Sequence, residues 1–119
     1  ILTKLVAFDQ NFADQALAYT LQARKLAPTD AKLAYNQAKI ELFLGQTGSG
    51  VAHLEEALKL KPNYPDPRFD LAAEQLQQGQ LIQARENYQY ILDHLNAKDS
   101  TSLQEIKLID ASLSAQKQN

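Results

Sequence analysis

The sequence repeats itself with a fixed period, and this period constrains the fold more than any other feature. Gly45 recurs as Gly79, which lies 34 residues later. The same offset relates Ala16 to Gly50 and Gly50 to Ala84, and it also relates Ala23 to Ala57, Leu26 to Leu60, Pro28 to Pro62, Ala38 to Ala72 and Leu54 to Tyr88. A period of this length is typical of stacked supersecondary units that bury their apolar faces against neighbours. We therefore expect an extended surface rather than one closed core around a catalytic pocket.

The composition is that of a small globular protein and excludes several classes. The chain has 119 residues, of which 45% are hydrophobic, and a net charge of −2. Because no basic run is present, the sequence does not predict nucleic-acid binding. No apolar run approaches the ~18 residues of a membrane-spanning helix. There is no cysteine, so the sequence is compatible with the cytoplasm and with the periplasm. The first residue is Ile1 rather than Met, which indicates a piece of a longer protein.

Glycine and proline occur four times each and mark the expected ends of helices. Hydrophobic spacing predicts helices over residues 1–9, 12–27, 31–44, 50–61, 66–78 and 81–95. The first two are expected to be separated by a turn at Gln10 and Asn11. Thr29 or Asp30 is expected to cap the helix from residue 31, and Ser49 the helix from residue 50. No segment alternates as a strand does, so the expected fold class is all-α.

A further helix is expected over residues 102–114, outside the repeat pattern. Ser102 followed by Glu105 has the spacing of a capping box ahead of an apolar run. Stacked repeats leave an apolar face at each end, so this segment is expected to act as a C-terminal capping helix. The polar tail from about Ser114 is expected to fray.

These positions resemble the tetratricopeptide repeat, a helix–turn–helix motif with the same period. The residues that match its pattern in the middle repeat are Ala38, Gly45, Gly50, Leu54, Ala57 and Pro62. The resemblance implies an α-solenoid of antiparallel helix pairs, forming a superhelix as one domain over residues 1–119. The implied repeats span about residues 1–30, 31–64 and 65–97, with the first truncated. We interpret the chain as a bacterial-type domain of this family.

The sequence departs from the family pattern at several positions. In the first repeat Asn11 stands in place of the turn glycine and Thr20 in place of an aromatic residue. Position 4, usually a large aromatic residue, holds Ala34 and Arg68. Position 11 holds Glu41 and Gln75, and Asn96 replaces the closing proline of the third repeat. The departures at positions 4 and 11 loosen the match of each first helix to the family pattern but not the period.

The few motifs that resemble chemical sites have simpler explanations. The Gly45–Gly50 segment has the glycine spacing of a phosphate-binding loop, but it is followed by Val51 and Ala52 rather than by Lys and Ser or Thr. His53 has Ser49 one turn before it, yet no acid is evident to orient its ring, and His94 is distant in sequence. Asp66 and Asp70 are interpreted as a solvated pair near a helix start. The sequence therefore predicts no catalytic, metal or cofactor site, and no enzyme activity.

The family resemblance implies ligand contacts at positions 2, 5, 9, 12 and 13 of each first helix, on the concave face. Carried over, the predicted groove residues are Lys32, Tyr35, Lys39, Leu42 and Phe43 in the middle repeat, Asp66, Phe69, Ala73, Leu76 and Gln77 in the third, and Ile1, Leu5, Phe8 and Asp9 in the first. Such a surface suits an extended peptide or an amphipathic helix with apolar anchors. Leu42, Phe43 and Leu76 could instead pack inside the repeats.

The expected function is a non-catalytic scaffold that binds a peptide or helix of a partner protein. The alternatives are an appendage of a larger bacterial envelope-assembly or polymer-export protein, and self-association through the open first repeat. The family also contains a carboxylate clamp that grips acidic peptide tails through lysine, asparagine and arginine. Asn36 matches one clamp position, but the third-repeat positions hold Asp66 and Asp70. Two acids in place of two cations lead us to reject the clamp.

Overall fold

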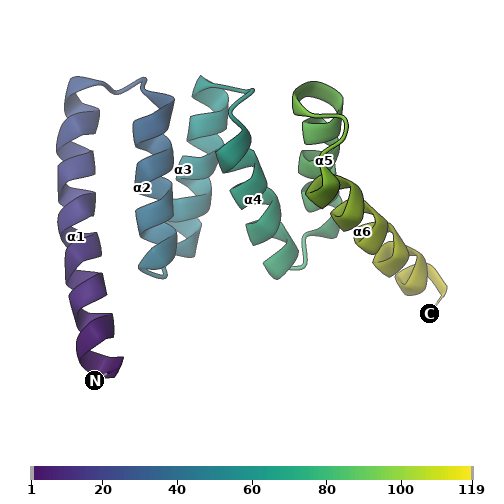
Figure 1. Ribbon diagram of the computed structural model, residues 1–119, viewed down its shortest axis with the longest axis horizontal. Helices are drawn as coiled ribbons and strands as arrows, with labels where there is room; N and C mark the ends of the chain where they lie inside the picture. The colour runs from purple at the N-terminus through teal and green to yellow at the C-terminus, as the bar shows by residue number, and fades with distance from the viewer. Residues whose placement is uncertain (1, 119) are drawn as a thin grey trace. The chain divides into compact units, whose positions relative to one another are not determined.

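The computed structural model describes the backbone of residues 2–118 and the side chains of residues 10–118, and the described part is helical without strands (Figure 1). The helices are α1 (Leu2–Leu26), α2 (Ala31–Phe43), α3 (Thr47–Leu60), α4 (Pro65–Gln77), α5 (Leu81–Tyr90), the π-helical turn η1 (Ile91–Leu95) and α6 (Ser100–Gln118). The chain divides into two compact units, unit 1 (Ile1–Pro62) and unit 2 (Asn63–Asn119). None of the described helices is long and apolar enough to span a membrane.

Unit 1 contains α1, α2 and α3, with α2 packed against both of the others (Figure 1). The predicted turn at Gln10 and Asn11 is wrong, because α1 continues without interruption through both residues. The later repeats turn at Gly45 and Gly79, whose φ angles are +80° and +76°. Asn11 stands in their place, and neither glycine nor proline occurs before Pro28. Asparagine adopts a left-handed backbone less readily than glycine, so the helix can continue through Asn11.

The turns that follow α2 and α4 are built in the same way. The amide of Gly45 donates to the carbonyl of Leu42 at 3.1 Å, and the amide of Gln46 donates to that of Glu41 at 2.8 Å. The next turn repeats both bonds at the same distances: the amide of Gly79 donates to the carbonyl of Leu76, and the amide of Gln80 donates to that of Gln75. This is a Schellman motif, which satisfies the last carbonyls of a helix around a left-handed glycine. The prediction that Gly45 and Gly79 end their helices is confirmed.

The start of α3 differs from its prediction. The helix begins at Thr47, directly after the Schellman turn, so Ser49 lies inside its first turn and is not the N-cap. The N-cap is Gln46, whose side chain makes no capping hydrogen bond. Inside α3, Gly50 is a point of close contact with α2: a Cβ atom there would lie 2.6 Å from Leu42 Cγ. The small residue at this position therefore sets how closely the two helices approach.

Unit 2 contains α4, α5, η1 and α6 around one hydrophobic cluster. Its buried members are Ala72 of α4, Ala84 and Tyr88 of α5, Ile91 of η1, and Ile106 and Ile109 of α6. Phe69 and Leu76 of α4 pack against this cluster from its edge. The prediction that the last helix covers the third repeat is confirmed by the burial of Ile106 and Ile109 on its inner side.

The second helix of the third repeat ends in a π-helical turn that the sequence did not predict. The amide of Asn96 donates to the carbonyl of Ile91, five residues back, at 2.7 Å. The corresponding residue of the previous repeat is Pro62, which has no amide hydrogen to donate. The replacement of the closing proline by Asn96 is therefore what makes this wider turn available.

The N-terminus of α6 also differs from its prediction. The helix begins at Ser100, and Asp99 supplies the capping oxygen, accepting from the Ser102 amide at 2.8 Å. Ser102 is fully buried and lies in the first turn of the helix, so the capping box with Glu105 is wrong. By contrast, Asp30 caps α2 as expected, accepting from the Lys32 amide at 2.9 Å.

Candidate partner-binding surface

The predicted groove residues of α2 divide between interior and surface. Lys32 and Lys39 are exposed, and the side chain of Phe43 is 62% exposed. Tyr35 is buried, at 8% exposure, and Lys39 Nζ lies 4.5 Å above the centre of its ring. Leu42 is half-buried against Gly50 of α3. On α2, the accessible part of the predicted set is therefore the two lysines and Phe43.

The predicted residues of α4 divide in the same manner. Asp66, Ala73 and Gln77 are exposed. Phe69 and Leu76 are half-buried because they pack against the hydrophobic cluster of unit 2. The first-repeat candidates Ile1, Leu5, Phe8 and Asp9 lie outside the residues whose side chains are described. That the exposed α4 residues contact a ligand stays a prediction.

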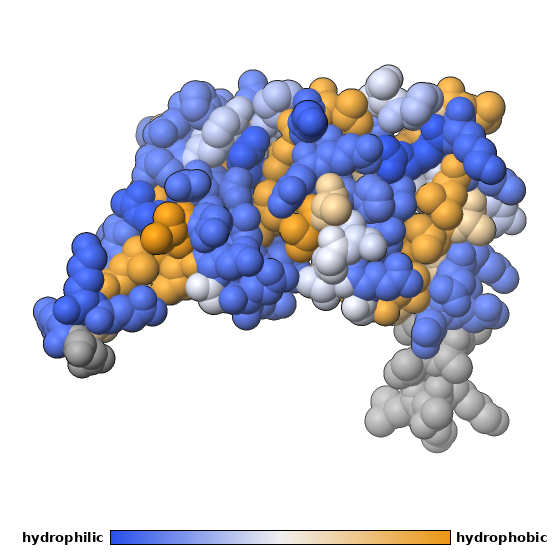
Figure 2. Space-filling model, turned by 180° about the vertical axis from the view of Figure 1, so that it is seen from behind, coloured by the Kyte–Doolittle hydropathy of each residue, from blue (hydrophilic) through white to orange (hydrophobic). Residues whose placement is uncertain are grey.

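A hollow between α1 and α2 lies on the surface of unit 1. It has a volume of about 420 Å³ and is lined by Phe12, Ala13 and Ala16 of α1 and by Lys39, Ile40 and Phe43 of α2. Phe12 and Phe43 are 66% and 62% exposed. Figure 2 shows apolar surface in this unit bordered by polar surface. We call this feature the α1–α2 hollow.

Sequence reasoning found only part of the α1–α2 hollow. Lys39 and Phe43 are among the predicted groove residues, whereas Phe12 is not. The signal for Phe12 is its place in the period: the residues one and two periods later are Gln46 and Gln80, the polar N-caps of α3 and α5. An aromatic residue at a position that is otherwise polar and exposed is a candidate for a surface contact.

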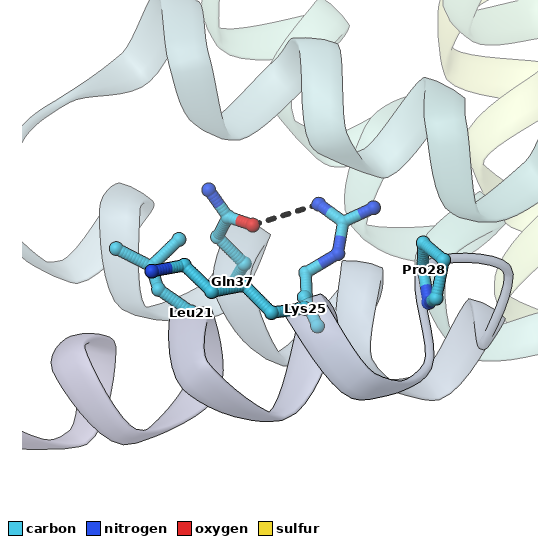
Figure 3. Close-up of a pocket in the computed structure, with 5 residues that line it drawn as sticks. Leu21, Lys25, Pro28 and Gln37 are labelled. Carbon is cyan, nitrogen blue, oxygen red and sulfur yellow. Dashed lines mark hydrogen bonds between the residues drawn. The ribbon is translucent and has the colours of Figure 1, made fainter.

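A second hollow of about 470 Å³ lies at the other end of α1 (Figure 3). Its lining residues are Leu21, Arg24, Lys25, Pro28 and Gln37. Arg24 Nη1 donates to Gln37 Oε1 at 2.8 Å, which is the dashed line in Figure 3. Because Arg24 is held by this bond and by Glu56, at 2.5 Å, we assign its guanidinium to joining the helices rather than to ligand binding.

Polar side chains connect the three helices of unit 1 through its interior. Gln37 and Glu41 of α2 are each only 6% exposed. Gln37 accepts from Arg24 of α1 and donates to Glu41 Oε2 at 3.2 Å. The other carboxylate oxygen of Glu41 lies 2.5 Å from Nδ1 of His53 in α3. Gln37 and Glu41 thus both have partners, as their burial requires.

Unit 2 has a polar pair at the same repeat positions. Gln75 stands one period after Glu41, and Asn87 stands one period after His53. Asn87 Nδ2 donates to Gln75 Oε1 at 2.7 Å, and Asn87 Oδ1 accepts from Arg68 at 3.0 Å. The departures at position 11 are therefore half of a paired contact between the two helices of the second and of the third repeat.

Arg68, the departure at position 4 of the third repeat, also has a structural role. The guanidinium of Arg68 lies 3.6 Å from the centre of the Tyr90 ring. Burial lowers the pKa of Arg68, and the interaction with Tyr90 opposes this shift. A flat cation stacked on an aromatic face occupies the place that a large aromatic residue usually fills in this pattern.

The interpretation that no acid orients His53 is wrong, because Glu41 contacts its Nδ1 atom. The matching Gln75–Asn87 pair joins the same two positions of the next repeat through uncharged side chains, so the Glu41–His53 contact has a counterpart in helix packing. Among the described residues, no three histidine or acidic side chains gather as a metal site would require.

The comparisons agree with this architecture. No protein-family model and no curated protein matches the sequence. Among solved structures, the chain is similar to the first TPR of Spaghetti (RPAP3) bound to the HSP90 peptide SRMEEVD. The TM-score is 0.75 and the sequence identity is 20%, over 90% of this chain and 84% of that one. The chain therefore has the fold of a tetratricopeptide repeat domain, and the predicted fold class, an α-solenoid of helix pairs, is confirmed.

Proposed function

We propose that this chain is a non-catalytic scaffold that binds a peptide or helix of a partner protein, with the α1–α2 hollow as its anchoring site. The observation that carries the proposal is the presence of two exposed phenylalanines, Phe12 and Phe43, on opposite walls of one apolar hollow. Exposed aromatic residues gathered in a concavity are typical of protein-interaction sites. The structurally similar domain was solved with a bound peptide, which supports this kind of ligand.

The chemistry of the hollow indicates what the ligand should present. Among its six described lining residues, five are apolar and Lys39 is the charged one. We infer a ligand with an aliphatic or aromatic anchor and a neighbouring acidic residue that reaches Lys39. The acidic tail bound by the similar domain is not the ligand that we expect here. Asp66 and Asp70 hold the positions where the family's clamp uses cations, and they would repel it.

A displayed library of helical and extended peptides, selected on this chain, tests the proposal. Binding of the selected peptides should weaken about tenfold or more on Phe43→Ala, because truncating an aromatic anchor costs ~2 kcal/mol or more. The matched control is Leu108→Ala, since Leu108 of α6 is 55% exposed and lies outside the hollow. Peptides that bind Phe43→Ala as tightly as the unmodified chain would show that the hollow is not the site.

Phe43 is the better variant for this test than Tyr35 or Phe69. Both of those predicted groove residues are largely packed inside their units, so truncation would change folding together with binding. Helical content by circular dichroism should stay unchanged in Phe43→Ala. That the domain serves as an appendage of a larger bacterial assembly protein stays a prediction.

A further inference from the structure

One face of α1 carries alternating large and small side chains at heptad spacing. Its members are Phe12, Ala16, Tyr19, Ala23 and Leu26, which we call the α1 seam. The separations of four, three, four and three residues place them in one row, as at the a and d positions of a coiled coil. The three large members are 66%, 73% and 90% exposed, in chain order. The seam is therefore open along its length.

The middle of the equivalent face is covered in both later repeats, while its ends are exposed, at Gln46 and Leu60 in α3 and at Gln80 and His94 in the second helix of the third repeat. Gly50, His53 and Ala57 of α3 stand one period after Ala16, Tyr19 and Ala23. Gly50 and Ala57 are buried, and His53 is bonded to α2. In α5, the corresponding Ala84 and Ile91 are buried and Asn87 is bonded to α4. The surface of α1 is thus of a kind that a neighbouring helix covers elsewhere in this chain, while among the described residues no helix covers it.

We propose that the occupant of the α1 seam is the α1 seam of a second copy, packed antiparallel about a two-fold axis. In this antiparallel pairing, Tyr19 and Phe12 at d positions face small residues at a positions, and the same register sets Leu26 opposite Asp9 at the end of the pair. Tyr19 then faces Ala16 of the second copy while Ala16 faces its Tyr19, and Phe12 faces Ala23 likewise. Large side chains packed against alanines fill space efficiently and allow close approach. Because each contact occurs twice, the interface closes as a dimer.

The electrostatics of the seam also favour a second copy. The residues that flank it at the neighbouring heptad positions are Ala13, Gln15, Thr20 and Gln22. None of them is charged, so the pairing of two identical surfaces brings no like charges together. Like charges across an interface are a common obstacle to self-association.

The size of the seam sets the expected strength. Covering its three exposed large side chains on both copies removes on the order of 1,000 Å² of accessible surface. This value lies at the low end of the range for specific complexes, so we expect a dissociation constant in the micromolar range. The dimer should therefore form reversibly as the protein concentration rises.

Sedimentation velocity of the full chain between about 2 and 200 µM is the first test. The unmodified chain should shift from monomer to dimer, and Tyr19→Glu should stay monomeric at the highest concentration. Tyr19 is already 73% exposed, so this change does not disturb the monomer core. The matched control is Ile82→Glu, at a 60%-exposed apolar residue of α5, which should dimerise normally. A monomer throughout, or equal effects of both variants, would overturn the proposal.

Cysteine cross-linking tests the pairing geometry. The chain has no cysteine, so the introduced thiols are the only ones in the sequence that can form a disulfide. A mixture of Ala16→Cys and Tyr19→Cys copies should form a disulfide-linked heterodimer faster than a mixture of Ala16→Cys and Ile82→Cys copies. Equal rates would overturn the antiparallel pairing. Phe12 and Ala16 belong to both surfaces, whereas Tyr19 lies only in the seam and Phe43 only in the α1–α2 hollow. Tyr19→Glu therefore tests dimerisation, and Phe43→Ala tests peptide binding.

Discussion

At the scale of single residues, small side chains determine how closely the paired helices approach. Ala38, Ala57, Ala72 and Ala84 are completely buried, and Gly50 leaves no room for a Cβ atom beside Leu42. Protein interiors are packed so closely that one added methylene group changes the stability of the fold. These positions explain why the repeat pattern requires small residues at fixed places.

Replacement of Ala72 by leucine should lower the free energy of unfolding by about 1–3 kcal/mol through overpacking. Its neighbour Ala73 is exposed, so Ala73→Leu is a matched control that adds the same atoms at the surface. Urea denaturation followed by circular dichroism measures both. Equal stability of the two variants would contradict the burial of Ala72.

Tyr88 should titrate at higher pH than an ordinary tyrosine. Burial raises its pKa, and the carboxylates of Glu105 and Asp99 raise it further. Since the native state favours the protonated phenol, this stability is present below the ordinary tyrosine pKa of about 10. It is lost as the pH rises through the elevated value. Ultraviolet absorbance of the phenolate should show a transition above the ordinary range that Tyr88→Phe lacks.

At the scale of helices, local sequence signals predicted the helix ends correctly only where tertiary contacts do not also decide where the helix ends. Asp30, Gly45 and Gly79 behave as expected because caps and left-handed glycines act through the nearest backbone groups. The start of α6 was misplaced because Ser102 matches a capping motif, yet its burial in unit 2 depends on tertiary contacts. The predicted break in α1 came from applying the repeat pattern where its glycine is absent.

The candidate site was predicted less well than the fold, for a related reason. Periodicity identifies which residues share a helix face but does not separate a binding face from a packing face. Tyr35, Phe69 and Leu76 have the expected spacing, and they are covered by neighbouring side chains. Phe12 was missed as an anchor because its exposure depends on how α1 packs against α2.

Removal of the Asp99 side chain should destabilise unit 2 by about 1 kcal/mol, because the first turn of α6 loses its capping acceptor. Asp99→Ala should lower the midpoint of thermal unfolding, while Asp99→Ser should restore most of the loss. Serine also supplies an oxygen at an N-cap. Identical midpoints for the alanine variant and the unmodified chain would show that the cap contributes nothing.

At the scale of the whole molecule, the buried contacts are organised within each unit. Unit 1 is connected by the Arg24, Gln37 and Glu41 contacts, and unit 2 by its hydrophobic cluster together with the Arg85–Asp110 ion pair. In repeat proteins, stability is approximately a sum of the repeats and the interfaces between neighbours. Damage in one unit should therefore spread incompletely to the other.

Hydrogen exchange of Ala72→Leu should show this unequal response. Protection should fall most in α4, α5 and α6, because all three contribute to the cluster that contains Ala72. The amides of α2 and α3 should lose less protection. A uniform loss across the chain would mean that the two units unfold as a single cooperative body.

The Glu41–His53 and Gln75–Asn87 pairs bear on a risk in the folding of any repeat protein, which is that helices from different repeats pair with one another. If α4 docked on α3 in place of α2, several packing positions would still match, because Ala72 and Leu76 stand one period after Ala38 and Leu42. The exchanged interface, however, would separate the carboxylate of Glu41 from the imidazole of His53, which it meets at 2.5 Å in the correct one. It would bring Gln75 to that ring instead. Because the two repeats carry chemically different polar pairs at the same position, these contacts favour the correct pairing of each helix with its own partner.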